Sequence, residues 1–180
     1  MDEWKDEDRL KMYVAIAETS RKWVSVMDTK AGFLSALNAA LLAFIWTGAR
    51  LLECGPWSKG FALTASSLAI LSLLFSLLTV IPRGSLAQIF GAESRYINDF
   101  KPISFYGYVA EYYPKGHENK FIEDVLALSP TKLCHEVLEQ HYTISHGLKI
   151  KSNWVERAGW LLVGGLALTA LALLAKFADF

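Results

Sequence analysis

Three long stretches of the chain, 31–49, 60–82 and 158–175, contain no charged residue. Each is close to the length of about 20 apolar residues with which an α-helix crosses a bilayer. The whole chain is 53% hydrophobic with a mean hydropathy of +0.26, which is high for a soluble domain. The sequence therefore predicts an all-α integral membrane protein with three transmembrane helices.

Most of the basic residues lie in two segments, the one before residue 31 and the one over 83–157. Only Arg50 and Lys59 lie between the first two charge-free stretches, and only Lys176 follows the third. Because cytoplasmic segments are enriched in Lys and Arg, the N-terminus and segment 83–157 are predicted to be cytoplasmic and the C-terminus to lie outside. Together, the N-terminal helix and segment 83–157 are expected to form a small helical cytoplasmic domain.

The periodicity of the polar segments adds two long helices. Mostly apolar positions spaced by three and four residues, from Leu10 to Met27, predict an amphipathic helix in the N-terminal segment. No Pro or Gly follows in the sequence before Gly32, so this helix is expected to run unbroken into the first span. Ser129 and Pro130 have the pattern of an N-cap and a first helical residue, and the helix that they open is expected to continue into the third span. The amphipathic positions are Leu10, Tyr13, Ala17, Ser20, Trp23 and Met27. The predicted organisation is a cytoplasmic amphipathic helix over 1–30, transmembrane helices over 31–49, 60–82 and 158–176, an outer loop over 50–59 and a cytoplasmic region over 83–157.

The ends, cysteines and net charge add further expectations. The chain opens with the polar run MDEWKDEDR instead of a basic and then apolar run, so no cleaved signal peptide is expected. Cys54 and Cys134 fall on opposite sides of the membrane in this topology and are not expected to pair. A formal net charge of zero indicates no nucleic-acid partner.

Small and hydroxyl-bearing residues form a stripe along each predicted span. Such stripes let helices approach closely in lipid, where helix association has no hydrophobic drive. Two interpretations remain open: packing of the three helices within one chain, and self-assembly of several chains. The stripes are Ala62, Ala65, Ala69, Ser72, Ser76 and Thr79 in the second span, Gly32, Ala36, Ala40, Ala43 and Thr47 in the first, and Gly165, Thr169 and Ala172 in the third.

Three polar residues in and just before the first span are also candidate functional residues. Asn38 is expected to form hydrogen bonds between helices, because polar groups at that depth in the membrane are usually paired or face water. Asp28 and Lys30 are expected at the level of the cytoplasmic headgroups, where they form a membrane-interface motif.

An aromatic and basic stretch over 95–120 is the candidate site for a small ligand. Arg95 and Lys101 have the charge to neutralise a phosphate, Asn98 the groups to bind a base edge, and Tyr106 and Tyr108 the rings to stack on a base. The alternative is that these aromatic residues form the core of the cytoplasmic domain or lie at the membrane surface.

No residue pattern indicates catalysis or a metal. His135 and His141 are six residues apart and point to different faces of a helix, and the spacing of the four histidines fits no zinc motif. No nucleophile triad, Walker loop or carboxylate pair is present. We therefore expect a protein that is not an enzyme, with no cofactor and no metal.

The order of these elements resembles the transmembrane effector family of Pycsar systems, bacterial antiphage defences that signal with cyclic pyrimidine mononucleotides. The similarity covers roughly residues 10–174, and its most specific parts are DTKA at 28–31, the following span with Asn38, and FYG at 105–107. The resemblance implies that 83–157 is a sensor region for cyclic UMP or cyclic CMP made by a partner cyclase. It further implies an effector, expected to be a homo-oligomer, that impairs the bacterial inner membrane. The alternative is a structural or scaffold membrane protein whose cytoplasmic domain binds a protein.

Overall fold

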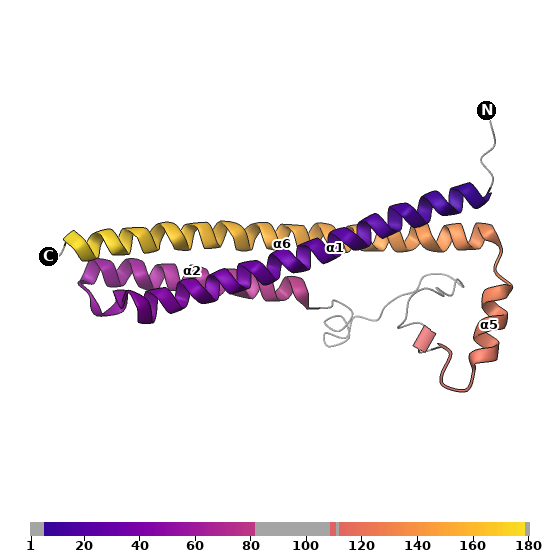
Figure 1. Cartoon of the computed structure of the whole chain (residues 1–180), viewed down its shortest axis with the longest axis horizontal. Coiled ribbons are helices and arrows are strands. Elements are labelled where there is room, and N and C mark those ends of the chain that lie inside the picture. Colours follow the sequence, from indigo (N-terminus) through magenta and orange to yellow (C-terminus); the bar gives the residue numbers. More distant parts are fainter. Residues whose placement is uncertain (1–5, 82–108, 111, 179–180) are drawn as a thin grey trace, which may run out of the picture. The chain divides into compact units, whose positions relative to one another are not determined.

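The computed structural model describes residues 6–81, 109–110 and 112–178. This part of the chain contains four α-helices and no strand, as Figure 1 shows. Three of the helices are long and apolar enough to cross a membrane, which confirms the predicted fold class. The helices are α1 (Asp6–Ala43), α2 (Pro56–Val80), α5 (Glu118–Leu126) and α6 (Pro130–Ala178).

The chain divides into two compact units. One comprises Met1–Arg21 and Ala87–Ser145, and the other comprises Lys22–Leu86 and His146–Phe180. Helices α1 and α6 contribute residues to both units, because each continues without a break from a polar into an apolar segment. The unbroken helices expected from the sequence are therefore present.

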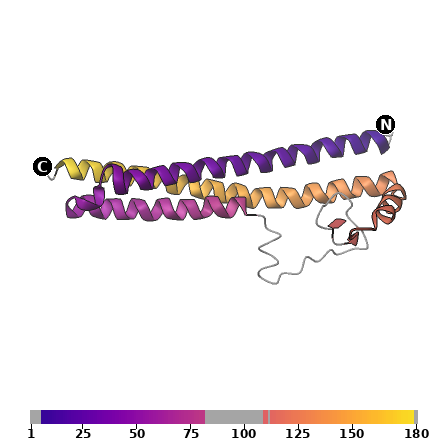
Figure 2. The same ribbon diagram turned by 60° about the horizontal axis from the view of Figure 1, so that its bottom comes forward.

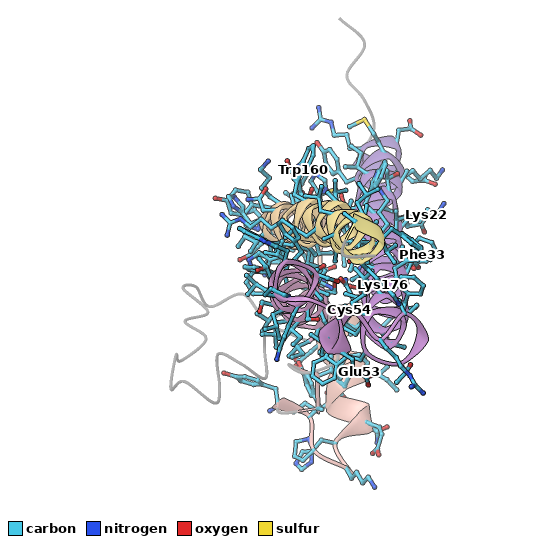
Figure 3. All side chains as sticks on the ribbon, turned by 90° about the vertical axis from the view of Figure 1, so that its left-hand side faces the viewer. Lys22, Phe33, Glu53, Cys54, Trp160 and Lys176 are labelled. Atoms are coloured by element: carbon cyan, nitrogen blue, oxygen red, sulfur yellow. The ribbon has the colours of Figure 1, made fainter. Side chains whose placement is uncertain are left out.

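The second unit is a bundle in which the apolar parts of α1, α2 and α6 lie side by side (Figure 2). Its buried apolar residues are mainly alanines, with Leu41, Ile45, Leu51 and Leu162 as the larger members. Large side chains cover the outside, and Figure 3 shows Phe33 and Trp160 pointing away from the bundle. This inversion of the usual core composition is typical of helices that are solvated by lipid.

The connection between α1 and α2 differs from the predicted outer loop over 50–59. Helix α1 gives way to a π-helix at Phe44–Gly48 and then to a 3-10 helix at Leu51–Glu53. Arg50, between them, has a φ of 47°, in the left-handed region that a non-glycine residue rarely adopts. Helix α2 begins at Pro56 because proline suits the first helical turn, so the second span starts four residues before the predicted Gly60.

In the first unit, the helix starts and turns follow local sequence rules. The hydroxyl of Ser129 accepts a hydrogen bond from the Lys132 backbone N–H at 3.4 Å, which confirms the predicted cap of α6. Gly116, at a φ of 94°, makes the turn that leads to α5. Tyr113 packs edge-on against Phe121 of α5 with ring centroids 5.1 Å apart.

The amphipathic face of α1 is also as expected, with one exception. Ala17 and Ser20 are buried, but Trp23 is 50% exposed, and Val24 is more buried than Trp23. The polar Ser20 belongs to the buried face because its hydroxyl is hydrogen-bonded to Nδ1 of His141 at 3.0 Å.

Candidate functional site

The membrane-interface motif is divided between an ion pair and an exposed cation. The carboxylate of Asp28 forms an ion pair with Lys151 of α6, whose side chain is only 15% exposed. Lys30 is exposed, and among the described residues it has no ion-pair partner. Asp28 is thus tied to α6 instead of to its near neighbour Lys30.

Asn38 joins all three helices of the bundle in one polar network. Its side-chain Nδ2 donates to the Leu34 carbonyl at 2.8 Å and to the Ser72 hydroxyl at 2.7 Å. The Ser72 hydroxyl in turn donates to the backbone carbonyl of Ala158 at 2.7 Å. Asn38 is fully buried, and its Oδ1 atom has no hydrogen-bond partner in the described part of the chain.

The small-residue stripe of α2 faces the interior of the bundle. Ser72, Ser76 and Thr79 are fully buried, and Ser76 and Thr79 return hydrogen bonds to carbonyls in their own helix. A second link from α2 to α6 runs from the Ser58 hydroxyl to the Ala172 carbonyl at 3.0 Å. Packing within one chain therefore already uses this stripe.

The corresponding stripe of α1 lies on the outside. Gly32, Ala36, Ala40, Ala43 and Thr47 are exposed, so the interpretation that they pack within one chain is wrong for this bundle. A helix turns by about 100° per residue, so Asn38 points away from Ala36 and Ala40. Burial of the Asn38 amide, which is costly to leave in lipid, explains why α1 turns its small residues outward.

The candidate ligand residues Arg95, Asn98, Lys101, Tyr106 and Tyr108 lie outside the described residues. They stay predictions. In the described chain that follows them, hydrogen bonds hold the turn that leads to α5.

Two ionisable groups near the start of α5, Tyr113 and Glu118, have shifted pKa values. Burial, and then the hydrogen bond that its hydroxyl donates to Asp124 at 2.8 Å, raise the pKa of Tyr113. Hydrogen bonds from its own backbone N–H and from that of Gly116 lower the pKa of Glu118. These contacts fix the turn before α5.

The polar residues where α1 and α6 meet in the first unit are paired. Arg21 donates to Gln140 at 2.9 Å, and Gln140 donates to the almost fully buried Glu136 at 3.3 Å. No group of three metal-binding side chains is found among the residues searched, which are the described ones. The two cysteines are free.

Sequence reasoning missed three residues that fasten the bundle: Lys151, Ser58 and Lys176. Lys176 donates from Nζ to the carbonyl of Ala49 at 2.9 Å and so ties the end of α6 to the end of the first span; Figure 3 shows it at that end. Each partner is more than 110 positions away in the sequence, as the separations of 114, 123 and 127 show. No local spacing rule connects residues so far apart.

These features define a class of protein: a membrane protein that is helical over the described residues, with a polar network inside a three-helix bundle and two helices that continue into the polar first unit. A family model described as the Pycsar effector protein domain matches residues 12–176. The chain belongs to this family, and membership supports a role as an effector in antiphage defence. The comparisons with curated proteins and with solved structures gave no match.

Proposed function

We propose that this protein senses a cyclic mononucleotide through its cytoplasmic region and impairs the bacterial inner membrane through assembly of its transmembrane helices. The observation that carries the proposal is the continuity of α1 and α6, each of which runs from polar residues of one unit into apolar residues of the other. A helix without a break is a stiff connection between a sensing segment and a spanning segment. The family to which the chain belongs supports the same function.

The proposed ligand is cyclic UMP or cyclic CMP from a partner cyclase. Arg95 and Lys101 would neutralise the cyclic phosphate, Asn98 would bind the base edge, and Tyr106 or Tyr108 would stack on the base. A ligand shifts an equilibrium only by its difference in affinity for the two states. The nucleotide must therefore bind more tightly to the assembled state than to the resting one.

The resting state is held by the contacts that fasten the bundle: Asp28 with Lys151, Asn38 with Ser72, and Lys176 with Ala49. Assembly would use faces that are free in a single chain. The exposed stripe of α1 is one such face, because small residues allow another helix to approach closely. We propose a homo-oligomer with no cofactor and no catalytic step.

The proposed orientation places the N-terminus in the cytoplasm and the C-terminus outside. Single-cysteine variants test it, since Cys54 and Cys134 are both partly exposed and both free. A membrane-impermeant maleimide should label Cys54 in intact spheroplasts of the Cys134→Ser variant. It should label Cys134 in the Cys54→Ser variant only after permeabilisation. Labelling of Cys134 from outside would contradict the orientation.

Nucleotide binding should raise the thermal stability of the purified full-length protein. A ligand that binds only the folded state at 100 times its dissociation constant adds about 2.7 kcal/mol to the free energy of unfolding. We expect a rise in Tm with cyclic UMP or cyclic CMP and none with the linear monophosphates. The Arg95→Ala and Lys101→Ala variants should lose the shift and keep the ligand-free Tm. A Tm that neither cyclic nucleotide changes would contradict the sensing step.

A further inference from the structure

A line of buried hydroxyl groups runs along α2 through the inside of the bundle. From the first to the last of these side chains the helix rises about 32 Å, and the hydrocarbon core of a bilayer is about 30 Å thick. The hydroxyls therefore reach from one side of the membrane to the other. The line consists of Ser58, Ser66, Ser72, Ser76 and Thr79.

Close packing alone does not explain the hydroxyls at the Thr79 end of the line. Ser76 and Thr79 donate only to carbonyls of their own helix, at 3.0 Å and 2.9 Å. Within the described chain neither hydroxyl accepts a hydrogen bond, although a hydroxyl oxygen has two lone pairs. Alanine and valine would pack as closely without this unused acceptor capacity. Polar side chains that face the inside of a membrane bundle often mark the path of water or ions.

Asn38 adds a second, independent observation beside this line. Its side chain is fully buried and bonded to Ser72, and its Oδ1 has no hydrogen-bond partner among the described residues. Asn38 lies about 12 Å along α1 from Lys30, close to the middle of the hydrocarbon core. An amide oxygen without a hydrogen bond is costly in such surroundings, and a water molecule would relieve that cost. Oδ1 is sealed from solvent in the closed bundle, so water reaches it only when the helices separate.

Hydrogen bonds and an ion pair hold the helices around this line together. The Ser72 hydroxyl accepts from the Asn38 amide at 2.7 Å and donates to the Ala158 carbonyl at 2.7 Å, so it joins α2 to both other helices. The ion pair of Asp28 with Lys151 joins α1 to α6. An assembled state that draws α1 away would break these contacts and leave the hydroxyls and Oδ1 to water.

We propose that the leak of the triggered effector passes through the inside of the bundle, as a chain of water molecules along the α2 hydroxyls with Asn38 at mid-depth. This path rests on the proposed impairment of the membrane and adds which helix faces line the leak. The competing arrangement is a leak between neighbouring chains, lined by the exposed stripe of α1 that contains Ala40.

The double variant Ser76→Ala with Thr79→Val tests the role of the hydroxyls. The Tm of the purified protein should not change, because neither of the removed hydroxyls bonds to another helix. Depolarisation in cells that also contain the cyclase should slow several-fold. Thr64→Val with Ser67→Ala is the matched control, because it removes two exposed hydroxyls of α2 that also bond only within their own helix, and it should leave the rate unchanged. Equal rates for the two double variants would overturn the proposal.

The reaction of single cysteines with aminoethyl methanethiosulfonate, a small cation, locates the path directly. The background is the chain with Cys54→Ser and Cys134→Ser, since both native cysteines are free. Ser76→Cys should react at least about tenfold faster in cells that contain the cyclase, because the reactive thiolate forms in water and not in a dry interior. Reaction at Ala40→Cys but not at Ser76→Cys in depolarised cells would place the leak between chains and overturn the proposal. A normal membrane potential with the unmodified chain and cyclase would instead contradict the proposed function, on which this path depends.

Discussion

Replacing both Ser72 and Ser76 by leucine is expected to lower the free energy of unfolding of the bundle by about 2–6 kcal/mol, because added carbons in a close-packed interior cost about 1–3 kcal/mol at each site. Both serines are fully buried between the helices, with an exposed fraction of 0%. The change at Ser72 also removes the hydrogen bonds to Asn38 and to the Ala158 carbonyl. The variant should lose toxicity while still inserting into the membrane, since the hydropathy of the span rises.

Ser67→Leu is the matched control for this variant. Ser67 lies on the exposed face of α2, and its hydroxyl bonds only to the Leu63 carbonyl of the same helix. We expect its Tm and toxicity to equal those of the unmodified chain. Thermal unfolding in detergent and growth assays measure both. Full stability of the Ser72 and Ser76 double variant would show that the stripe of α2 does not pack as described.

The second large effect is expected at the ion pair of Asp28 with Lys151. Asp28→Asn leaves a largely buried ammonium group without its counter-charge, which should cost about 1–3 kcal/mol, between the values for exposed and for buried pairs. Lys151 is 15% exposed and Asp28 37% exposed, which places the pair between these limits. The loss should appear as a lower Tm of the purified protein.

The charge-swapped double variant, Asp28→Lys with Lys151→Asp, separates pairing from other roles. A direct ion pair predicts that the swap recovers at least half of the stability lost in either single variant, because a double-mutant cycle isolates the interaction of the two groups. Additive losses in the double variant would instead show that the two side chains act independently.

The spans, the unbroken helices and the cap of α6 could be predicted from the sequence because their causes are local. A run without charge, the absence of Gly and Pro, and a Ser-Pro pair each act within a few residues. The rotation of α1 could not be predicted with equal ease, because both of its faces are apolar enough to be buried. The choice depends on Asn38, whose amide reaches Ser72 on a helix 34 residues away in the sequence.

The candidate site shows the same division. Asp28 and Lys30 were singled out by their place at the start of a span, but the partner of Asp28 is 123 positions away. Likewise, the small residues of α1 form a recognisable stripe, yet only the packed bundle shows that they face outward. Spacing along one helix identifies a face and does not identify what covers it.

The most direct test of the central claim is the membrane potential of cells that express this chain together with a cyclase that makes cyclic UMP or cyclic CMP. We predict depolarisation, followed by dye entry, when chain and cyclase are both present and with neither alone. The Ser72 and Ser76 double variant should prevent it and Ser67→Leu should not. A normal membrane potential with both nucleotides, in cells whose membranes contain the inserted chain, would contradict the effector mechanism and favour a scaffold whose cytoplasmic domain binds a protein.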